Sequence, residues 1–234
     1  MIDWHSHILP DVDDGSRNLD ESIQMLDALI SQGVDTVAAT PHFYANAESV
    51  DEFLSRRDEA CEALCKKAED RNIRIVCGAE VRYYPGISRM EDLGKLKIGG
   101  TNLLLLEMPM TKWTDYTVNE LIELANTRSL KLVMAHIERY IRMQDNRVLG
   151  KLLENSILIQ ANASFFDRFA TRKKAVRMLE SGCIHFIGSD CHNLTSRPPK
   201  LEFAYDLIRR KLGEDFVSQM NEYGYQVVGQ QVQI

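Results

Sequence analysis

The chain begins with Ile2-Asp3-Trp4-His5-Ser6-His7, a short apolar run that ends in two histidines. On an extended segment, residues two apart point to the same side, so His5 and His7 can face one metal ion or two neighbouring ions. A matching pair, Asp190 and His192, follows another apolar run near the end of the chain. These stretches predict strands that deliver pairs of polar side chains to one site.

Seven short apolar runs alternate with amphipathic stretches along the chain. Most of the runs are continuous, as expected for strands buried in a parallel sheet. The predicted strands are Ile2–Trp4, Val34–Ala39, Arg74–Gly78, Leu103–Leu106, Lys131–Ala135, Ile157–Ala161 and Ile184–Gly188. The predicted helices are Asp20–Gln32, Glu48–Arg71, Tyr116–Arg128, Asp145–Glu154, Arg172–Ser181 and Lys200–Lys211. This alternation predicts an α/β fold, and seven parallel strands indicate a closed or nearly closed barrel.

Acidic or imidazole side chains directly follow six of the seven predicted strands. They are His5, His7, His42, Glu80, Glu107, His136, Asp190 and His192. Barrel enzymes place catalytic groups at the C-terminal ends of strands, so we expect these side chains to meet. Their charges would repel one another, or their protonation would shift, unless cations neutralised them. The pattern therefore predicts a metal centre with nitrogen and oxygen ligands, which suits manganese, iron, zinc or cobalt.

A histidine at a strand end also has an ordinary explanation, since a single one is more often a hydrogen-bonded structural residue. Five of the six histidines, however, share such ends with three acidic residues, and independent packing roles do not predict that clustering. The remaining histidine, His185, lies inside a predicted strand and is interpreted as structural.

The composition is ordinary for a globular protein, with 234 residues, 44% hydrophobic and 26% charged. This length is compatible with a single domain over residues 1–234. The net charge of -6 and the scattered lysines and arginines argue against nucleic acid as a partner. No apolar run approaches about 20 residues and the N-terminus lacks a signal pattern, so we expect no membrane insertion and a cytoplasmic location. No pattern indicates an oligomeric state.

The five cysteines include no C-x-x-C pair and indicate neither a disulfide framework nor a thiolate zinc site. Cys61 and Cys65, one helical turn apart, are interpreted as packing residues. Cys191 and Arg197 have the C-x5-R spacing of cysteine-dependent tyrosine phosphatases. We disfavour that mechanism, because no glycine lies between them to let the backbone wrap a phosphate. Cys191 also lies between two predicted ligands and would point away from them.

Several motifs carry a family resemblance. They are Asp3-Trp4-His5-Ser6-His7-Ile8-Leu9-Pro10 with Asp13-Asp14-Gly15, Thr40-Pro41-His42, Glu80, Glu107-Met108-Pro109, Ala135-His136-Ile137-Glu138-Arg139-Tyr140 and Gly188-Ser189-Asp190-Cys191-His192. Together they resemble the PHP (polymerase and histidinol phosphatase) superfamily. The opening motif and Arg197-Pro198-Pro199 are more narrowly similar to its bacterial protein-tyrosine phosphatases. Those enzymes belong to capsular and exopolysaccharide operons and act on autophosphorylated tyrosine kinases.

The resemblance implies a distorted seven-stranded (β/α)7 barrel that holds three divalent metal ions, with manganese as the expected metal. One ion would bind His5, His7, Glu80 and Asp190, a second would bind Glu80, Glu107 and His136, and a third would bind Asp14, His42 and His192. Glu80 would bridge two ions. Asp14 lies in a loop rather than at a strand end, so its role follows from the resemblance, and Asp11 or Asp13 could be confused with it.

The charges of this centre favour a phosphate substrate. Three divalent ions and four carboxylate ligands leave an excess of about two positive charges, which suits a phosphate dianion. Arg139 and Arg197 could bind phosphate oxygens in forked geometry, and the alternative for each is a surface salt bridge. We expect them to act in catalysis with His42 and Asp14. A water between two metals, acidified towards hydroxide, would attack phosphorus.

The expected enzyme is a metal-dependent protein-tyrosine phosphatase whose partner and substrate is a bacterial tyrosine autokinase. A phosphatase of the same superfamily that acts on histidinol phosphate, or on another small phosphomonoester, needs the same ligands and is the alternative. Trp113 and Tyr116 could pack on the aromatic ring of a substrate or could simply anchor their loop. A metal-stabilised binding module without catalysis is a third interpretation.

Overall fold

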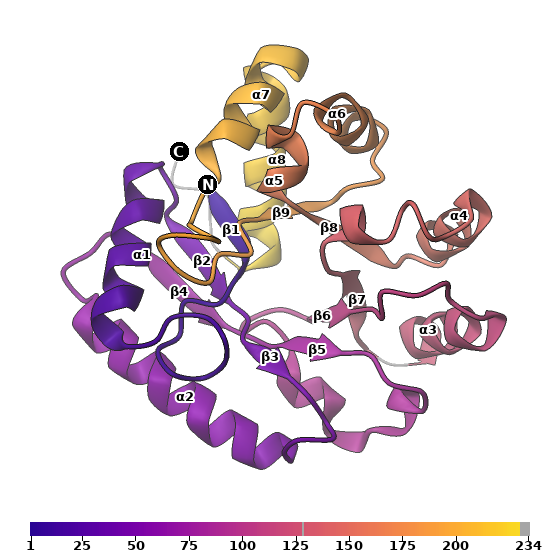
Figure 1. The fold of residues 1–234 in the computed structure, drawn as a ribbon, viewed down its shortest axis with the longest axis horizontal. Helices are drawn as coiled ribbons and strands as arrows, with labels where there is room; N and C mark the ends of the chain where they lie inside the picture. Colours follow the sequence, from indigo (N-terminus) through magenta and orange to yellow (C-terminus); the bar gives the residue numbers. More distant parts are fainter. Residues whose placement is uncertain (128, 230–234) are drawn as a thin grey trace.

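The computed structural model describes residues 1–127 and 129–229, which form an α/β fold with curled parallel sheets at its centre and helices outside (Figure 1). The strands are β1 (Ile2–Ser6), β2 (Thr36–Ala39), β3 (His42–Phe43), β4 (Arg74–Cys77), β5 (Glu80–Arg82), β6 (Leu103–Glu107), β7 (Lys131–Met134), β8 (Leu158–Asn162) and β9 (Phe186–Gly188). The α-helices are α1 (Leu19–Ser31), α2 (Val50–Lys67), α3 (Asp115–Thr127), α4 (Asn146–Glu154), α5 (Ala163–Asp167), α6 (Arg172–Glu180), α7 (Glu202–Leu212) and α8 (Glu214–Val227). Short 3-10 helices are η1 (Ile87–Arg89), η2 (Glu91–Leu96) and η3 (Ile137–Arg139).

The described strands form two parallel sheets, in the orders β1-β2-β4 and β3-β5-β6-β7-β8-β9. All seven predicted strands are present, but β3 and β5 were not predicted as separate strands. β3 follows β2 after Thr40 and Pro41, and β5 follows β4 after Gly78 and Ala79. Proline has no N–H to donate to a sheet, which accounts for the first interruption. Within the described residues, nine short strands in two sheets therefore correspond to the seven strands that the sequence predicted.

The first strand and the segment after the last strand lie side by side. The amide of Asp190 donates to the carbonyl of His5 at 2.8 Å, and the amide of His7 donates to the carbonyl of Cys191 at 2.9 Å. These bonds curl the sheets so that the carboxyl end of β1 meets the carboxyl end of β9. Residues 184 and 185 positions apart in the sequence are thereby brought into contact.

Apolar side chains fill the interior at the opposite end of the strands. Ile2 and Trp4 of β1 belong to a buried cluster with alternate residues of β6, including Leu103 and Leu105. Gly224 of α8 lies against these β1 side chains, and a Cβ there would meet the Ile2 side chain at 3.0 Å. Helix α8, near the C-terminus, thus packs on the amino end of β1.

The predicted helices are confirmed as α1, α2, α3, α4, α6 and α7, with ends that differ by a few residues. The predicted end of one helix at Arg128 lies outside the described residues. Local sequence explains why α1 and α2 begin where they do. The side chain of Asn18 accepts a hydrogen bond from the Glu21 amide, and Ser49 forms a capping box with Glu52.

The expectation of no disulfide was wrong. Cys61 of α2 and Cys77 of β4 are disulfide-bonded, with an S–S distance of 2.13 Å. The packing of α2 beside β4 pairs them, and spacing along the chain does not reveal such tertiary contacts. Cys65 is exposed rather than packed. Among the described residues, no helix is long and apolar enough to cross a membrane.

Candidate metal centre

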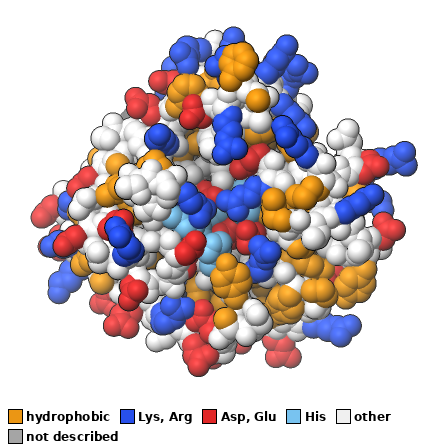
Figure 2. All heavy atoms as spheres, viewed as in Figure 1, with side chains coloured by type: hydrophobic (Ala, Val, Ile, Leu, Met, Phe, Trp, Pro, Cys, Tyr) orange, Lys and Arg blue, Asp and Glu red, His pale blue; other side chains and the backbone are white. Residues whose placement is uncertain are grey.

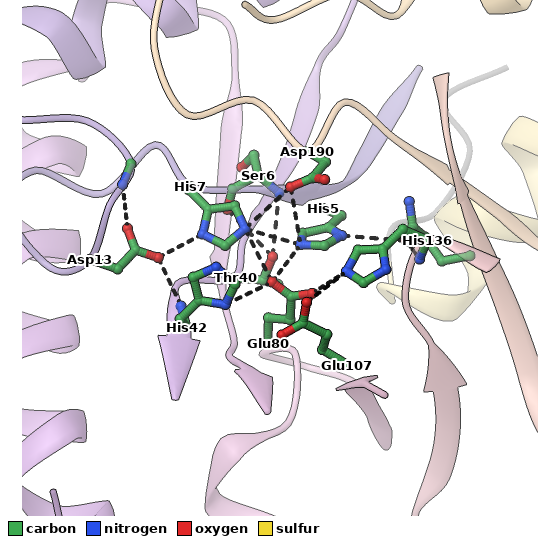
Figure 3. A network of polar contacts seen from close by, with 12 residues as sticks. His5, Ser6, His7, Asp13, Thr40, His42, Glu80, Glu107, His136 and Asp190 are labelled. Carbon is green, nitrogen blue, oxygen red and sulfur yellow. Dashed lines mark hydrogen bonds and ion pairs between the residues drawn. The ribbon is translucent and has the colours of Figure 1, made fainter. Parts of the chain in front are cut away.

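All nine predicted ligands gather at the carboxyl ends of the strands. Seven of them are labelled in Figure 3, where His5, His7, His42, Glu80, Glu107, His136 and Asp190 point towards one another from β1, β3, β5, β6 and the segments directly after β1, β7 and β9. The other two, Asp14 and His192, lie in the loop after β1 and in the segment after β9. On the surface, histidine side chains lie at the bottom of a hollow surrounded by acidic and basic groups (Figure 2). The groups whose ligand atoms lie within 4.8 Å of one another are His7, Asp14, His42 and His192; His5, His7 and Asp190; and His42, Glu80 and Glu107, which overlap the three predicted ligand sets without matching them.

The first predicted set is deeply buried. The Nε2 atoms of His5 and His7 lie 3.1 Å apart, and Glu80 Oε2 lies 3.2 and 3.3 Å from them. Asp190 Oδ1 is 3.9 Å from His5 Nε2 and 3.5 Å from His7 Nε2. Ligands about 2.1 Å from one ion are separated from each other by roughly 3–3.5 Å. The spacing of these four groups therefore suits a single cation.

The second set shares Glu80 with the first. The other oxygen of Glu80, Oε1, lies 2.7 Å from His136 Nε2, and Glu107 Oε1 lies 3.6 Å from the same nitrogen. Glu80 thus presents one oxygen to each set. This is the arrangement required of a bridging carboxylate.

The third set is more open. Asp14 Oδ1 lies 3.5 Å from His42 Nε2 and 3.4 Å from His192 Nε2, although Asp14 itself is 65% exposed. His192 Nδ1 donates to the backbone carbonyl of Asp190 at 3.0 Å, which leaves Nε2 as an acceptor. That nitrogen is buried and has no hydrogen-bond partner among the described residues. His192 Nε2 therefore faces the Asp14 carboxylate with no proton to share between them. A cation in that position would satisfy both groups.

Close backbone packing positions these side chains. A Cβ at Gly188 would lie 2.5 Å from the Cβ of His5, and one at Gly15 would lie 2.2 Å from the carbonyl oxygen of His7. His136 and Asp190 both adopt positive φ angles, 33° and 53°. Such left-handed conformations are uncommon for residues other than glycine and are concentrated at functional sites.

Residues that the sequence analysis did not select hold the rings in place. Asp13 Oδ2 accepts from His7 Nδ1 at 2.6 Å and from the His42 amide at 2.8 Å. Gln160 Oε1 accepts from the His136 amide at 2.6 Å and lies 3.3 Å from His5 Nδ1. Metal-binding histidines are commonly oriented by such a partner on their second nitrogen. Asp13 entered the sequence analysis only as an alternative to Asp14 as a ligand, and no sequence signal pointed to Gln160.

The electrostatics of the cluster follow from burial and mutual contact. Burial raises the pKa of Glu80, but the charge of His5 and hydrogen bonds from His136, His42 and His5 outweigh it and hold that pKa well below its usual value. Burial likewise lowers the pKa of His7, yet the Asp13 carboxylate raises it to about 10. Without metal, the His7 imidazole therefore holds a proton, which a cation would displace on binding.

The donor chemistry fits divalent metal ions. The groups supply only nitrogen and oxygen, as predicted, and several are completely buried, including His5, His7 and Glu80. Buried charges of this kind need a counter-charge or a partner. Together with the unpartnered His192 nitrogen, the residues could hold cations of the borderline class that imidazole and carboxylate prefer.

Both predicted arginines lie at the edge of the centre. Arg139 Nη2 donates to Asp190 Oδ2 at 2.5 Å, and Arg197 Nη2 donates to Asp190 Oδ1 at 2.8 Å. They are 32% and 37% exposed, so each has part of its guanidinium facing solvent. Arg82, which the sequence analysis did not select, forms an ion pair with Glu107 Oε2 at 2.6 Å.

Other candidates lie away from the chemistry. The Cys191 thiol is fully buried and burial raises its pKa, which agrees with the rejection of a thiolate mechanism. His185 is outside the cluster and accepts from the Ile159 amide, as expected of a structural residue. Trp113 is buried and donates to the Pro109 carbonyl, so it anchors its loop, whereas Tyr116 is exposed.

Known proteins are similar to this chain over most of its length. The chain is 35% identical to the tyrosine-protein phosphatase CpsB of Streptococcus pneumoniae over 91% of each chain. It is 31% identical to the tyrosine-protein phosphatase YwqE of Bacillus subtilis, over 95% of this chain and 89% of YwqE. A crystal structure from work on YwqE and CpsB, described as metal-dependent tyrosine phosphatases, covers 99% of this chain with a TM-score of 0.85 and 26% identity.

A family model described as capsular polysaccharide synthesis, CpsB/CapC, matches residues 1–224. The match covers all nine gathered side chains and nearly the whole described fold. It confirms the narrower of the two resemblances drawn from the motifs. The chain belongs to the CpsB/CapC family of capsular polysaccharide synthesis.

Proposed function

We propose that this protein is a metal-dependent protein-tyrosine phosphatase that acts on a bacterial tyrosine autokinase of capsular or exopolysaccharide synthesis. One observation carries the proposal: nine imidazole and carboxylate groups from separate strands and loops meet within ligand distance of one another. Family membership and the names of the relatives support tyrosine phosphate as the substrate. The autokinase is inferred from the operon context of the family that the sequence resembles.

The proposed cofactor is a set of three divalent ions, with manganese as the preferred metal. His5, His7, Glu80 and Asp190 would hold the first, Glu80, Glu107 and His136 the second, and Asp14, His42 and His192 the third. When bound, the ions would lower the pKa of a water molecule that attacks phosphorus and would attract the phosphoryl oxygens. Nitrogen and oxygen ligands without thiolate support manganese, although iron, zinc and cobalt accept the same donors.

The protein's own residues would orient ligands and substrate. Asp13 holds the Nδ1 proton of His7, so that Nε2 faces the centre. Arg139 and Arg197 are fixed by Asp190 through their Nη2 atoms, and their Nη1 atoms make only longer contacts, 3.5 Å to Glu107 and 3.8 Å to Asp14, which a phosphate would replace. Two such forks would bind its oxygens and stabilise the charge that develops on them. Since a tyrosine phenolate has a pKa of about 10, it leaves more readily than an alkoxide.

We also propose that the strands form a seven-stranded barrel. We regard β2 with β3, and β4 with β5, as single strands that are interrupted at the site, which would make seven strands and a distorted (β/α)7 barrel. Residues 1–234 would then act as one domain. An autokinase phosphorylated inside the cell would place the phosphatase in the cytoplasm.

Activity measurements on the metal-loaded protein test the function. Manganese-loaded protein should hydrolyse phosphotyrosine peptides faster than phosphoserine peptides or histidinol phosphate, and a chelator should abolish turnover. Faster turnover of histidinol phosphate would favour the small-molecule alternative. Absence of turnover with metal bound would favour a binding module, and full activity without metal would refute the mechanism.

A further inference from the structure

The surface beyond the candidate metal centre carries a row of cations that the proposed reaction does not use. This basic strip consists of Arg142, Arg168, Arg172, Lys173, Lys174 and Arg177. It runs from the segment after η3 through the end of α5 and along α6. Residues 167–177 contain five basic residues and one acidic residue, in a chain whose net charge is -6.

The strip does not stabilise the fold through ion pairs. None of its six cations forms an ion pair with another described residue, and the Arg172 guanidinium lies over the face of the exposed Phe169 ring at 4.5 Å. The first turn of α6 contains three cations and no acidic residue. Cations are unfavourable at a helix N-terminus because of the helix dipole. A charge pattern that opposes local stability without a visible compensation suggests a functional role.

Three neighbouring hollows connect the strip to the candidate metal centre. The first, about 850 Å³, is lined both by Arg139, Asp190 and Arg197 of the candidate centre and by Arg168 of the strip. The second, about 260 Å³, shares Arg168 with the first and is also lined by Arg142 and Lys174. The third, about 520 Å³, shares Lys174 and includes Arg177. A continuous path thus leads from the phosphate-binding arginines along the strip.

The charge of this path favours one kind of occupant. The hollows are lined by seven cations, Arg139, Arg142, Arg168, Lys174, Arg177, Arg197 and Lys200, and by five carboxylates, Glu138, Asp167, Glu180, Asp190 and Glu202, which leaves an excess of positive charge. The first hollow is much larger than a phosphate group and opens directly beside Asp190. Helix α6 has nine residues and is about 14 Å long, which an extended peptide would follow with about four residues.

We propose that the basic strip binds an acidic stretch of polypeptide next to the phosphotyrosine of the substrate protein. The inference rests on the proposed phosphatase function and adds to it a preference for substrates with acidic flanks. The strip would contribute to binding rather than to chemistry, because its members do not contact the candidate metal ligands. Its effect should appear in KM rather than in kcat.

Kinetics on matched peptides test this proposal. The substrates are a phosphotyrosine peptide with six glutamates on each side, the same peptide with glutamine in their place, and p-nitrophenyl phosphate, which has no flanks. The test variant is R168Q/K174Q/R177Q in the full chain. The control variant K66Q/K67Q/K211Q removes the same charge from exposed lysines on α2 and α7.

In the test variant, kcat/KM for the acidic peptide relative to p-nitrophenyl phosphate should fall about tenfold through KM, as expected for the loss of three exposed ion pairs. The glutamine peptide and the control variant should change less than twofold. Added salt should reduce the wild-type preference for the acidic peptide. Circular dichroism melting verifies that both variants are folded.

Two results would overturn the inference while leaving the phosphatase intact. One is equal wild-type kcat/KM on the acidic and glutamine peptides. The other is unchanged peptide kinetics in the test variant together with lost binding to vesicles that contain phosphatidylglycerol, which would assign the strip to an anionic membrane. Failure of the wild-type protein to hydrolyse any phosphotyrosine peptide would instead refute the proposed function itself.

Discussion

The inner and outer parts of the candidate metal centre are built differently. The inner part consists of His5 on β1, His7 directly after β1 and Glu80 on β5, and all three are buried. The outer part depends on Asp14, which lies on a loop and is 65% exposed, and on His42, which is 13% exposed. Strands therefore fix His5, Glu80 and also His42 before any ion binds, and His192 is buried, so the loop leaves only Asp14 largely open to solvent.

This difference predicts how tightly each part should bind metal ions. Rigid, buried donors lose little freedom when an ion binds, so the inner ions should be held tightly and exchange slowly. The exposed Asp14 must be ordered by its ion, and water can compete for that position. The outer ion should therefore be the weaker one, and the substrate phosphate should enter from that side, near Arg197.

The largest expected effect comes from the inner part. Glu80→Gln removes the carboxylate that faces both inner sets, so kcat on a phosphotyrosine peptide should fall by about 10³-fold or more. Metal content measured by mass spectrometry should fall with it. Glu62→Gln, an exposed change on α2, is the control. Near-normal turnover of the Glu80 variant would show that the inner part is not the catalytic centre.

A smaller effect is expected in the outer part. Asp14→Asn should remove one ion and reduce kcat/KM by roughly 10- to 100-fold, because the two inner ions remain bound. Excess manganese should restore part of the activity, since the defect is mainly in ion affinity. If metal analysis found the inner and outer variants equally depleted, the distinction between the two parts would be lost.

Asp13 connects the two parts, because it contacts the His7 ring and the His42 amide. Asp13→Asn keeps the shape of the side chain but weakens the hold on His7, so metal affinity should fall about tenfold. Titration with manganese, followed by calorimetry, measures this change. Asp11→Asn is the matched control, as Asp11 is exposed and asparagine tolerates its positive φ angle. Equal affinities in the two variants would contradict the role of Asp13.

The same contrast explains what could be predicted from the sequence. Continuous apolar runs and the residues after them identified every strand-borne ligand, because strand direction places carboxyl ends together. Asp14 required the family resemblance, since no periodicity governs its loop. Asp13 and Gln160 were missed because orientation of a ring is a tertiary contact. The Cys61–Cys77 pair and the extra strands β3 and β5 also depend on how distant segments meet.

The smallest expected effect is on the stability of the metal-free protein. Its His7 has a pKa raised to about 10, above the value of 6.5 in the unfolded chain. The resulting stabilisation is complete below pH 6.5 and is lost as pH rises towards 10. The melting temperature should therefore fall by a few degrees between pH 7 and pH 10, and less so in Asp13→Asn. If the melting temperature changed equally with pH in the wild type and in Asp13→Asn, the coupling between His7 and Asp13 would be contradicted.

The most direct measurement is anomalous diffraction from crystals of the protein loaded with manganese. The account predicts a peak between His5, His7 and Asp190, a second beside His136 and Glu107, and a weaker third between Asp14, His42 and His192. Peaks elsewhere, or a fully loaded protein with no metal among these side chains, would contradict it.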